Sequence, residues 1–234
     1  MTNTDTHLVC LGGTLCDDRL YEPLLTYLGN LHTIWNPTNQ TSVEDAARAL
    51  LETLPDPVVV IGFSLGGFVA LEALRQSPER VLGVVLISGN AFPDDEGNSA
   101  GRRVDVETGR SSGLAELIQS RAESLVSSSC LNRGLIVQIL AAMAAALGDE
   151  VHARQAEMNI GRPDLRTTVR ETRTPILAIA GTDDRLCPRE RYVDLKLSAL
   201  VELEWIEGSG HFVPLEAPVK CAHLIKSFLE RHNL

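Results

Sequence analysis

Ser64 stands at the centre of a Gly-x-Ser-x-Gly motif within VVVIGFSLGGFVALEAL, residues 58–74. Apolar residues precede the motif and an apolar run of helical spacing follows it, so we expect a strand, a tight turn and a helix. Glycines at 62 and 66 suit a turn that lifts a serine hydroxyl out of the sheet as a nucleophile. Leu65 then begins the helix, where its free N–H and the helix dipole favour negative charge. The alternative is a small polar residue in an ordinary connection.

A serine nucleophile needs a base, and six histidines are available. His211 follows the apolar run 201–206 in the glycine-rich stretch EGSGHFVPLEAP. This position places it at the carboxyl edge of a parallel sheet, the edge that also carries Ser64 and where open α/β sheets bind ligands. We therefore predict His211 as the base. The other histidines lie at strand starts or in helical segments and are expected to be surface or packing residues: His7, His32, His152, His223 and His232.

The base in turn needs a carboxylate that fixes its tautomer and stabilises the imidazolium. Asp183 and Asp184 both follow the apolar run 176–180, in AGTDDRLCP, and end on the same sheet edge. Either aspartate gives the chain order Ser, Asp, His, which is the order of nucleophile-elbow hydrolases. Spacing alone leaves the choice between them open.

With these motifs, GFSLGG, GTDDRLCP and GSGHFVPLEAP, the sequence resembles the α/β-hydrolase superfamily over nearly its whole length, apart from residues 90–164. Members often carry Gly-x-x-Asp-x-x-x-Pro after the strand that bears the acid. Gly181, Asp184 and Pro188 fit this spacing. The resemblance therefore implies Asp184 as the acid and leaves Asp183 as a loop or capping residue.

The resemblance also implies an oxyanion hole made by two backbone N–H groups. One belongs to Leu65, and the other follows a His-Gly pair after the first strand, which this sequence replaces by Gly12-Gly13 in LGGTLCD. We assign the second N–H to Thr14, with Leu15 as the rival. The first predicted strand starts at about residue 8, so we expect the two leading antiparallel strands common in the superfamily to be absent and the sheet to be a minimal, six-stranded version.

Apolar runs alternate with segments of helical spacing along the chain. The predicted strands are 8–11, 32–35, 58–61, 81–87, 176–180 and 201–206, and the predicted helices are 18–28, 41–54, 65–76, 188–199 and 217–231. The helix over 41–54 is expected to open with a capping box of Thr41 and Glu44. This alternation predicts an α/β fold with a mainly parallel sheet covered by helices on both faces.

We expect a single domain over 1–234, with a helical lid insertion at about 90–164. Its start, GNAFPDDEGNSAGRR, is polar and is predicted to be a loop, followed by helices near 113–126, 132–147 and 149–158. A second helical layer without a gating role is the alternative. The apolar segment RGLIVQILAAMAAALG either lines an acyl pocket or serves only for packing.

Three arginines near the start of this insertion have two interpretations. Either they recognise a carboxylate or a phosphopantetheine group, or they belong to a solvated basic loop. The three residues are Arg102, Arg103 and Arg110.

The composition of the chain argues against several classes of binding partner and site. The formal charge of −10 argues against a nucleic-acid or anionic-membrane surface. Five cysteines without a Cys-x-x-Cys pair suggest neither a disulfide framework nor a zinc site. No signal-peptide pattern or membrane-spanning run is evident, so we expect a cytoplasmic protein; its oligomeric state stays open.

Taken together, the residues predict a serine hydrolase acting on a carboxylic ester of a small-molecule acyl substrate, without metal or organic cofactor. A thioesterase or a C–C bond hydrolase would use the same three side chains. A non-catalytic ligand-binding protein of the same fold is the alternative from another functional class.

Overall fold

The computed structural model describes residues 6–29, 32–54, 57–192, 195 and 198–234. Its centre is one six-stranded sheet with the order β2-β1-β3-β4-β5-β6, in which every neighbouring pair is parallel. The strands are β1 (His7–Leu11), β2 (His32–Trp35), β3 (Val58–Phe63), β4 (Val81–Ile87), β5 (Ile176–Gly181) and β6 (Val201–Ile206). The six predicted strands and the α/β fold class are confirmed.

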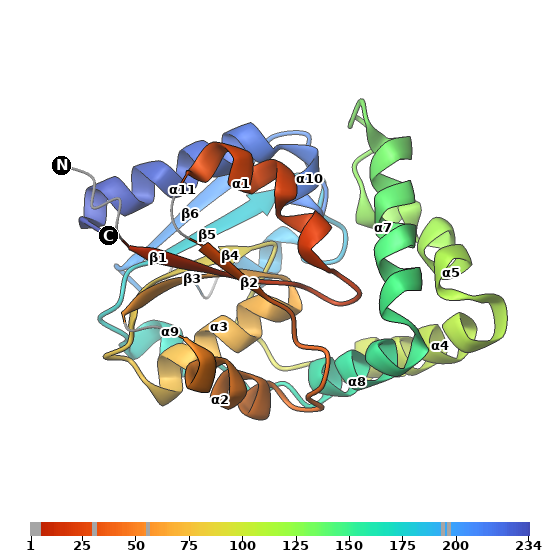
Figure 1. Ribbon diagram of the computed structural model, residues 1–234, viewed down its shortest axis with the longest axis horizontal. Coiled ribbons are helices and arrows are strands. Elements are labelled where there is room, and N and C mark those ends of the chain that lie inside the picture. The colour runs from red at the N-terminus through yellow and green to blue at the C-terminus, as the bar shows by residue number, and fades with distance from the viewer. Residues whose placement is uncertain (1–5, 30–31, 55–56, 193–194, 196–197) are drawn as a thin grey trace.

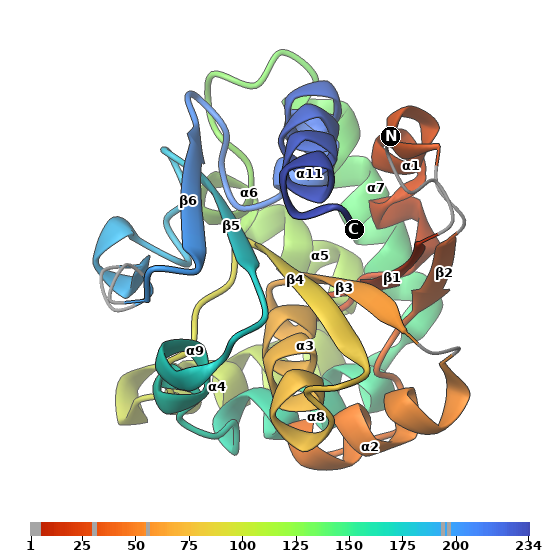
Figure 2. The same cartoon turned by 90° about the vertical axis from the view of Figure 1, so that its left-hand side faces the viewer.

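Helices cover both faces of this sheet (Figures 1 and 2). One face carries α1 (Glu22–Leu28) and α11 (Pro218–His232), and the opposite face carries α2 (Val43–Thr53), α3 (Leu65–Gln76) and α9 (Arg166–Glu171). Successive strand residues point to opposite faces, so Val9 packs with α2 and α3 whereas Leu8 packs with α1 and α11. The molecule therefore has two aliphatic cores separated by the sheet.

The start of α2 differs by one residue from the expected capping box. The N-cap is Ser42, whose side chain accepts a hydrogen bond from the Asp45 N–H at 3.1 Å. Thr41 lies one position too early for this role. Ser42 and Asp45 have the same spacing as Thr41 and Glu44, which explains why the sequence alone favoured the wrong pair.

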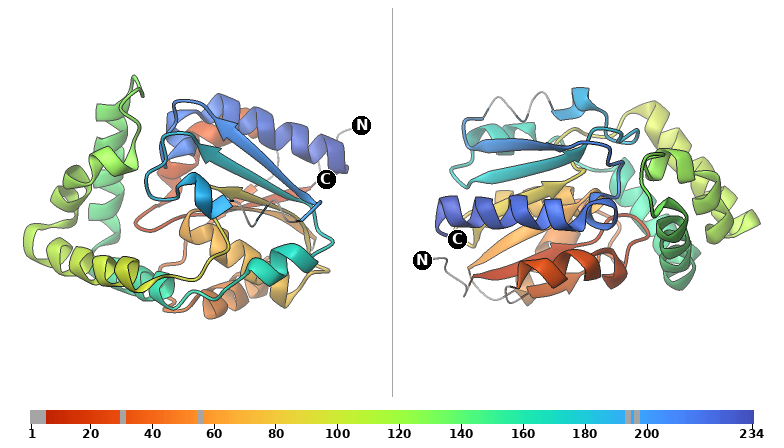
Figure 3. Two further views of the ribbon diagram at one scale, coloured as in Figure 1. Left: turned by 180° about the vertical axis from the view of Figure 1, so that it is seen from behind. Right: turned by 90° about the horizontal axis from the view of Figure 1, so that it is seen from above.

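Between β4 and α9 the chain forms five helices that stand beyond one end of the sheet (Figures 1 and 3). They are α4 (Glu96–Ser112), α5 (Leu114–Ser120), α6 (Ala122–Leu125), α7 (Arg133–Leu147) and α8 (Asp149–Ile160). Among the described residues no single helix is long and apolar enough to cross a membrane. The bent pair α7 and α8 passes that test on length and composition, with an angle of 99° between the two helices.

The prediction of a polar loop at the start of this segment is wrong from residue 96 onward, because these residues form the start of α4. Asp95 caps the helix by accepting from the Asn98 N–H at 2.9 Å, and a narrow stripe of Ser99, Val106 and Gly109 is buried. This stripe is too small and too polar to show as hydrophobic periodicity.

The prediction of a helix over 188–199 is also wrong in the part that the structure describes. A short 3₁₀ turn, Arg189–Tyr192, is present instead. Residues 193–194 and 196–197 of that prediction lie outside the described residues.

Candidate active site

Ser64 forms the turn between β3 and α3, with backbone angles φ 49° and ψ −112°. A positive φ is uncommon for a residue other than glycine and points to a constrained turn. The Ser64 N–H donates to the Ile87 carbonyl at 3.0 Å, which ties the turn to β4. A Cβ atom at Gly62 would lie 2.4 Å from the Gly66 carbonyl oxygen, and one at Gly66 would lie 2.4 Å from that of Leu11. Both glycines of the motif are therefore required by close backbone approach.

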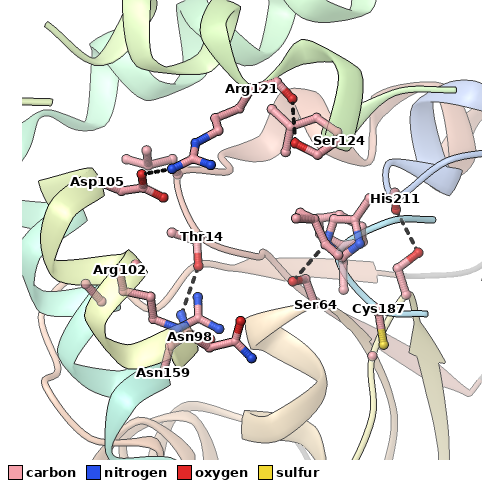
Figure 4. A pocket seen from close by; sticks show the side chains of 18 of the residues that line it. Thr14, Ser64, Asn98, Arg102, Asp105, Arg121, Ser124, Asn159, Cys187 and His211 are labelled. Atoms are coloured by element: carbon pink, nitrogen blue, oxygen red, sulfur yellow. Dashed lines mark hydrogen bonds and ion pairs between the residues drawn. The ribbon is translucent and has the colours of Figure 1, made fainter. Parts of the chain in front are cut away.

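His211 lies in the loop between β6 and α10 (Val213–Glu216), beside the Ser64 turn (Figure 4). Its Nε2 atom is 3.1 Å from Ser64 Oγ, and its Nδ1 atom is 2.8 Å from Asp184 Oδ2. With the proton on Nδ1 donated to the carboxylate, Nε2 is free to accept the serine O–H. The histidine and aspartate side chains are 6% and 0% exposed, so this contact is shielded from water.

Asp184 is fixed by the backbone of its own loop. Its second oxygen, Oδ1, accepts hydrogen bonds from the N–H groups of Leu186 and Cys187, both at 2.9 Å. One carboxylate oxygen therefore anchors the side chain while the other faces His211.

Asp183, the neighbouring aspartate, points elsewhere. Its carboxylate accepts from Ser127 Oγ at 2.5 Å and from Thr182 Oγ1 at 3.2 Å. The hydrogen bond from Ser127 is the main reason why the pKa of Asp183 lies below its ordinary value. The structure brings Asp184, and not Asp183, to the histidine.

Two side chains that the sequence did not single out hold the histidine loop. Glu216 accepts from the N–H groups of Gly210 at 2.9 Å and Phe212 at 3.0 Å, on either side of His211. Burial raises the pKa of the Glu216 carboxyl, and these N–H groups oppose that rise. Ser88, at the end of β4, donates its hydroxyl to the His211 carbonyl at 2.7 Å. The Ser88 contact leaves no local motif in the sequence, because its partner is 123 positions away.

The loop after β1 brings Thr14 to the pocket that contains Ser64 (Figure 4). The N–H of Leu15, the rival donor, is already donated to Gln155 Oε1 at 2.8 Å. Asn159 donates its Nδ2–H to Thr14 Oγ1 at 3.0 Å, so α8 holds this loop through two amide side chains. On the other side Leu65 is the first residue of α3, where backbone N–H groups have no acceptor within the helix.

A pocket of about 360 Å³ opens between these loops and the helices α4, α5, α6 and α8. Ser64, His211 and Thr14 lie on its floor (Figure 4). Its charged wall is formed by Arg102, Asp105, Arg121, Arg162 and Arg191. The sequence left open whether the apolar α7 lines an acyl pocket. Among the described residues that line the pocket none belongs to α7, because its buried face, including Ile136 and Leu140, packs into the core beneath α1 and α11. Packing is therefore its role.

The described residues contain no group of three His, Cys, Asp or Glu side chains placed to hold a metal ion. The arrangement can instead perform nucleophilic chemistry: a hydroxyl, a buried imidazole and a carboxylate in hydrogen-bonding sequence, at the floor of a pocket.

Comparison with known proteins relates the chain to a family. The model described as "Alpha/beta hydrolase family" matches residues 17–224. The "Biotin biosynthesis bifunctional protein BioHC" of Cellvibrio japonicus is 26% identical over 239 residues, which cover 95% of this chain but only 47% of that protein. The "Pimeloyl-[acyl-carrier protein] methyl ester esterase" of Aromatoleum aromaticum is 29% identical over 208 residues, covering 81% of each chain.

Among solved structures, a thermophilic esterase from Thermogutta terrifontis with bound malate superposes with a TM-score of 0.86. The two chains share 20% sequence identity, and the match covers 100% of this chain and 92% of the esterase. This likeness concerns the fold. The chain spans about half the length of the bifunctional relative, and most of the length of the single-function one.

Proposed function

This chain belongs to the alpha/beta hydrolase family, and from that premise we propose that it hydrolyses a carboxylic ester through an acyl-enzyme on Ser64. One observation carries the proposal. The hydrogen-bonded sequence Ser64, His211 and Asp184 is buried at its acid end and opens at its serine end into a pocket. The relative named as a methyl ester esterase supports an ester as the bond that is cleaved.

The proposed reaction follows from these positions. His211 Nε2 takes the proton of Ser64 Oγ while the oxygen attacks the ester carbonyl carbon, and Asp184 stabilises the imidazolium that forms. The carbonyl oxygen becomes an oxyanion, which the N–H groups of Thr14 and Leu65 stabilise. His211 then returns the proton to the departing alkoxide, and the C–O bond breaks. Water activated by the same histidine releases the acid and restores the serine.

The helices α4 to α8 are proposed to act as a lid, because four of them supply pocket residues opposite Ser64. A substrate bound beneath them is removed from water, which strengthens the polar contacts in the site. The proposed substrate is a small acyl ester, and no step requires a metal or an organic cofactor. Thioester and C–C hydrolysis would use the same three residues and are distinguished by the substrate panel below.

The test is a panel of p-nitrophenyl esters from acetyl to decanoyl, matched thioesters and a vinylogous diketone, together with a fluorophosphonate probe. We expect ester hydrolysis, labelling of Ser64, and a loss of roughly 10⁴- to 10⁶-fold in kcat/KM for Ser64→Ala. Ser112→Ala, an exposed serine at the end of α4, is the matched control and should retain wild-type rates.

Two outcomes would contradict the proposal. If no ester in the panel is hydrolysed and the probe does not label Ser64, the chain is not a serine esterase. If a vinylogous diketone is cleaved while simple esters are not, the same residues serve C–C hydrolysis.

A further inference from the structure

Asp94, just before α4, is a buried carboxylate shared by two arginines of the pocket wall. Arg102 donates from Nε at 3.1 Å and from Nη2 at 3.3 Å, and Arg162 approaches with Nη2 at 2.8 Å. The hydroxyl of Ser99 donates to the same carboxylate at 2.9 Å. The Asp94 side chain is 0% exposed, so it accepts hydrogen bonds from groups of the protein and not from bulk water.

The charges of this wall do not cancel. Arg121 pairs with Asp105 and Arg191 pairs with Asp95, one cation to one anion in each case. Arg102 and Arg162 share one carboxylate, Asp94, which leaves one positive charge in excess among the four described arginines of the wall and their three carboxylate partners.

The two arginines that share Asp94 differ in what they can still bind. Arg162 is 6% exposed, with Nε donated to the Phe92 carbonyl at 3.0 Å and Nη1 to the Asn159 carbonyl at 3.3 Å. Burial lowers the pKa of Arg162 to about 10, and the nearby charge of Arg102 adds to that lowering while Asp94 opposes it. It therefore stays charged at neutral pH, and each of its three nitrogens already has a partner within the protein.

Arg102 still has N–H groups that can donate to a ligand. Its side chain is 31% exposed, it lines the pocket, and no described residue accepts a hydrogen bond from its Nη1 group. It extends from α4 toward the pocket interior, on the same side as Thr14 (Figure 4). Two bonds to Asp94 fix the plane of its guanidinium, which preorganises the unused edge for an anion.

We propose that the substrate is an ester that carries a free carboxylate, and that Arg102 binds this carboxylate while Ser64 attacks the ester. The inference rests on the proposed function and specifies its substrate class. A single excess positive charge matches a monoanion, and a carboxylate accepts the two-pronged contact that a guanidinium offers. A phosphate monoester, with close to two negative charges at neutral pH, would leave a charge uncompensated.

The test compares ester pairs of equal length that differ in the end group. Monomethyl esters of four- to eight-carbon dicarboxylic acids carry the carboxylate on the acyl side, and methyl esters of the corresponding alkanoic acids are their neutral partners. Acetyl esters of hydroxy acids place the carboxylate on the alcohol side instead, and an acetylated phosphoethanol tests a phosphate. We expect one of the carboxylate series to exceed its neutral partner in kcat/KM, with phosphate below both.

Arg102→Gln should lower the ratio of kcat/KM for the acidic ester to that for its neutral partner about ten- to hundredfold, mainly through KM, since a charge-assisted hydrogen bond is lost. Arg102→Lys keeps the charge without the planar fork and should restore part of the ratio. Arg103→Gln removes the same charge from the next residue of α4, which is exposed and does not line the pocket, and should leave the ratio unchanged. Thermal midpoints establish that each variant is folded.

The inference fails if the wild-type protein hydrolyses neutral esters at least as well as every acidic partner, or if Arg102→Gln and Arg103→Gln change the ratio equally. In both cases ester hydrolysis itself would stand. If no ester of either kind is hydrolysed, the proposed function fails before the question of the carboxylate arises. A phosphate ester preferred over both carboxylate series would overturn the choice of anion.

Discussion

Asp183 and Asp184 are the same residue type at adjacent positions, yet their carboxylates serve different neighbours. Asp184 divides its oxygens between two backbone N–H groups and His211, whereas Asp183 binds the hydroxyl of Ser127 on the segment after α6. At the scale of single residues, the direction of the side chain decides the role: in the loop after β5 these two adjacent carboxylates face different neighbours.

This pair provides a sharp test of the proposed acid. Asp184→Asn should reduce kcat about 10⁴-fold, because the amide no longer fixes the histidine tautomer or stabilises the imidazolium. Asp183→Asn should keep kcat within about tenfold of wild type, since its carboxylate contacts no triad residue in the structure. Steady-state kinetics on one ester measure both variants. The reverse ranking would move the acid to Asp183.

At the scale of elements, α8 positions the loop after β1. Gln155 is fully buried, accepts from the Leu15 N–H at 2.8 Å and donates to the Pro37 carbonyl at 3.0 Å, so one side chain joins the loops that follow β1 and β2. Asn159, one turn later, reaches Thr14. A helix of the proposed lid thus shapes the proposed oxyanion hole.

Gln155→Ala should therefore affect catalysis without touching the triad. The Leu15 N–H loses its acceptor, which costs about 1–3 kcal/mol in the free energy of unfolding, and the loop that carries Thr14 relaxes. Loss of one oxyanion donor lowers kcat by about 10²- to 10³-fold when it is complete, and we expect part of that loss here. Chemical denaturation and steady-state kinetics give the two quantities. Gln138→Ala, at an exposed position of α7, is the matched control and should change neither.

The sequence predicted the sheet well, and the reason is physical. Strands such as β3 are buried on both faces, so they appear as continuous apolar runs, and the glycines around Ser64 are imposed by backbone contacts below 3 Å. The sequence failed for α4, whose burial depends on a thin stripe, and for Gln155, whose partner Leu15 is 140 positions away. Contacts of that separation leave no local pattern.

At the scale of the whole molecule, the insertion formed by α4 to α8 packs into both cores. Ile136 and Met143 of α7 lie in the core beneath α1 and α11, and Met158 of α8 lies in the core beneath α2 and α3. A segment that shares buried apolar surface with both faces of the sheet loses much of its stability when either face unfolds. We therefore propose that the chain is one cooperative domain rather than a sheet with an independently folding insertion.

The two tryptophans allow this to be tested, because Trp35 lies in β2 and Trp205 in β6, at opposite edges of the sheet and outside the helical insertion. Tryptophan fluorescence thus reports the sheet, whereas far-UV circular dichroism is dominated by helices, including α4 to α8. In a urea titration we expect the two signals to give the same midpoint and the same slope, as a two-state transition requires. A loss of helical signal at lower urea, with fluorescence unchanged, would show that α4 to α8 unfold first and contradict the single cooperative domain.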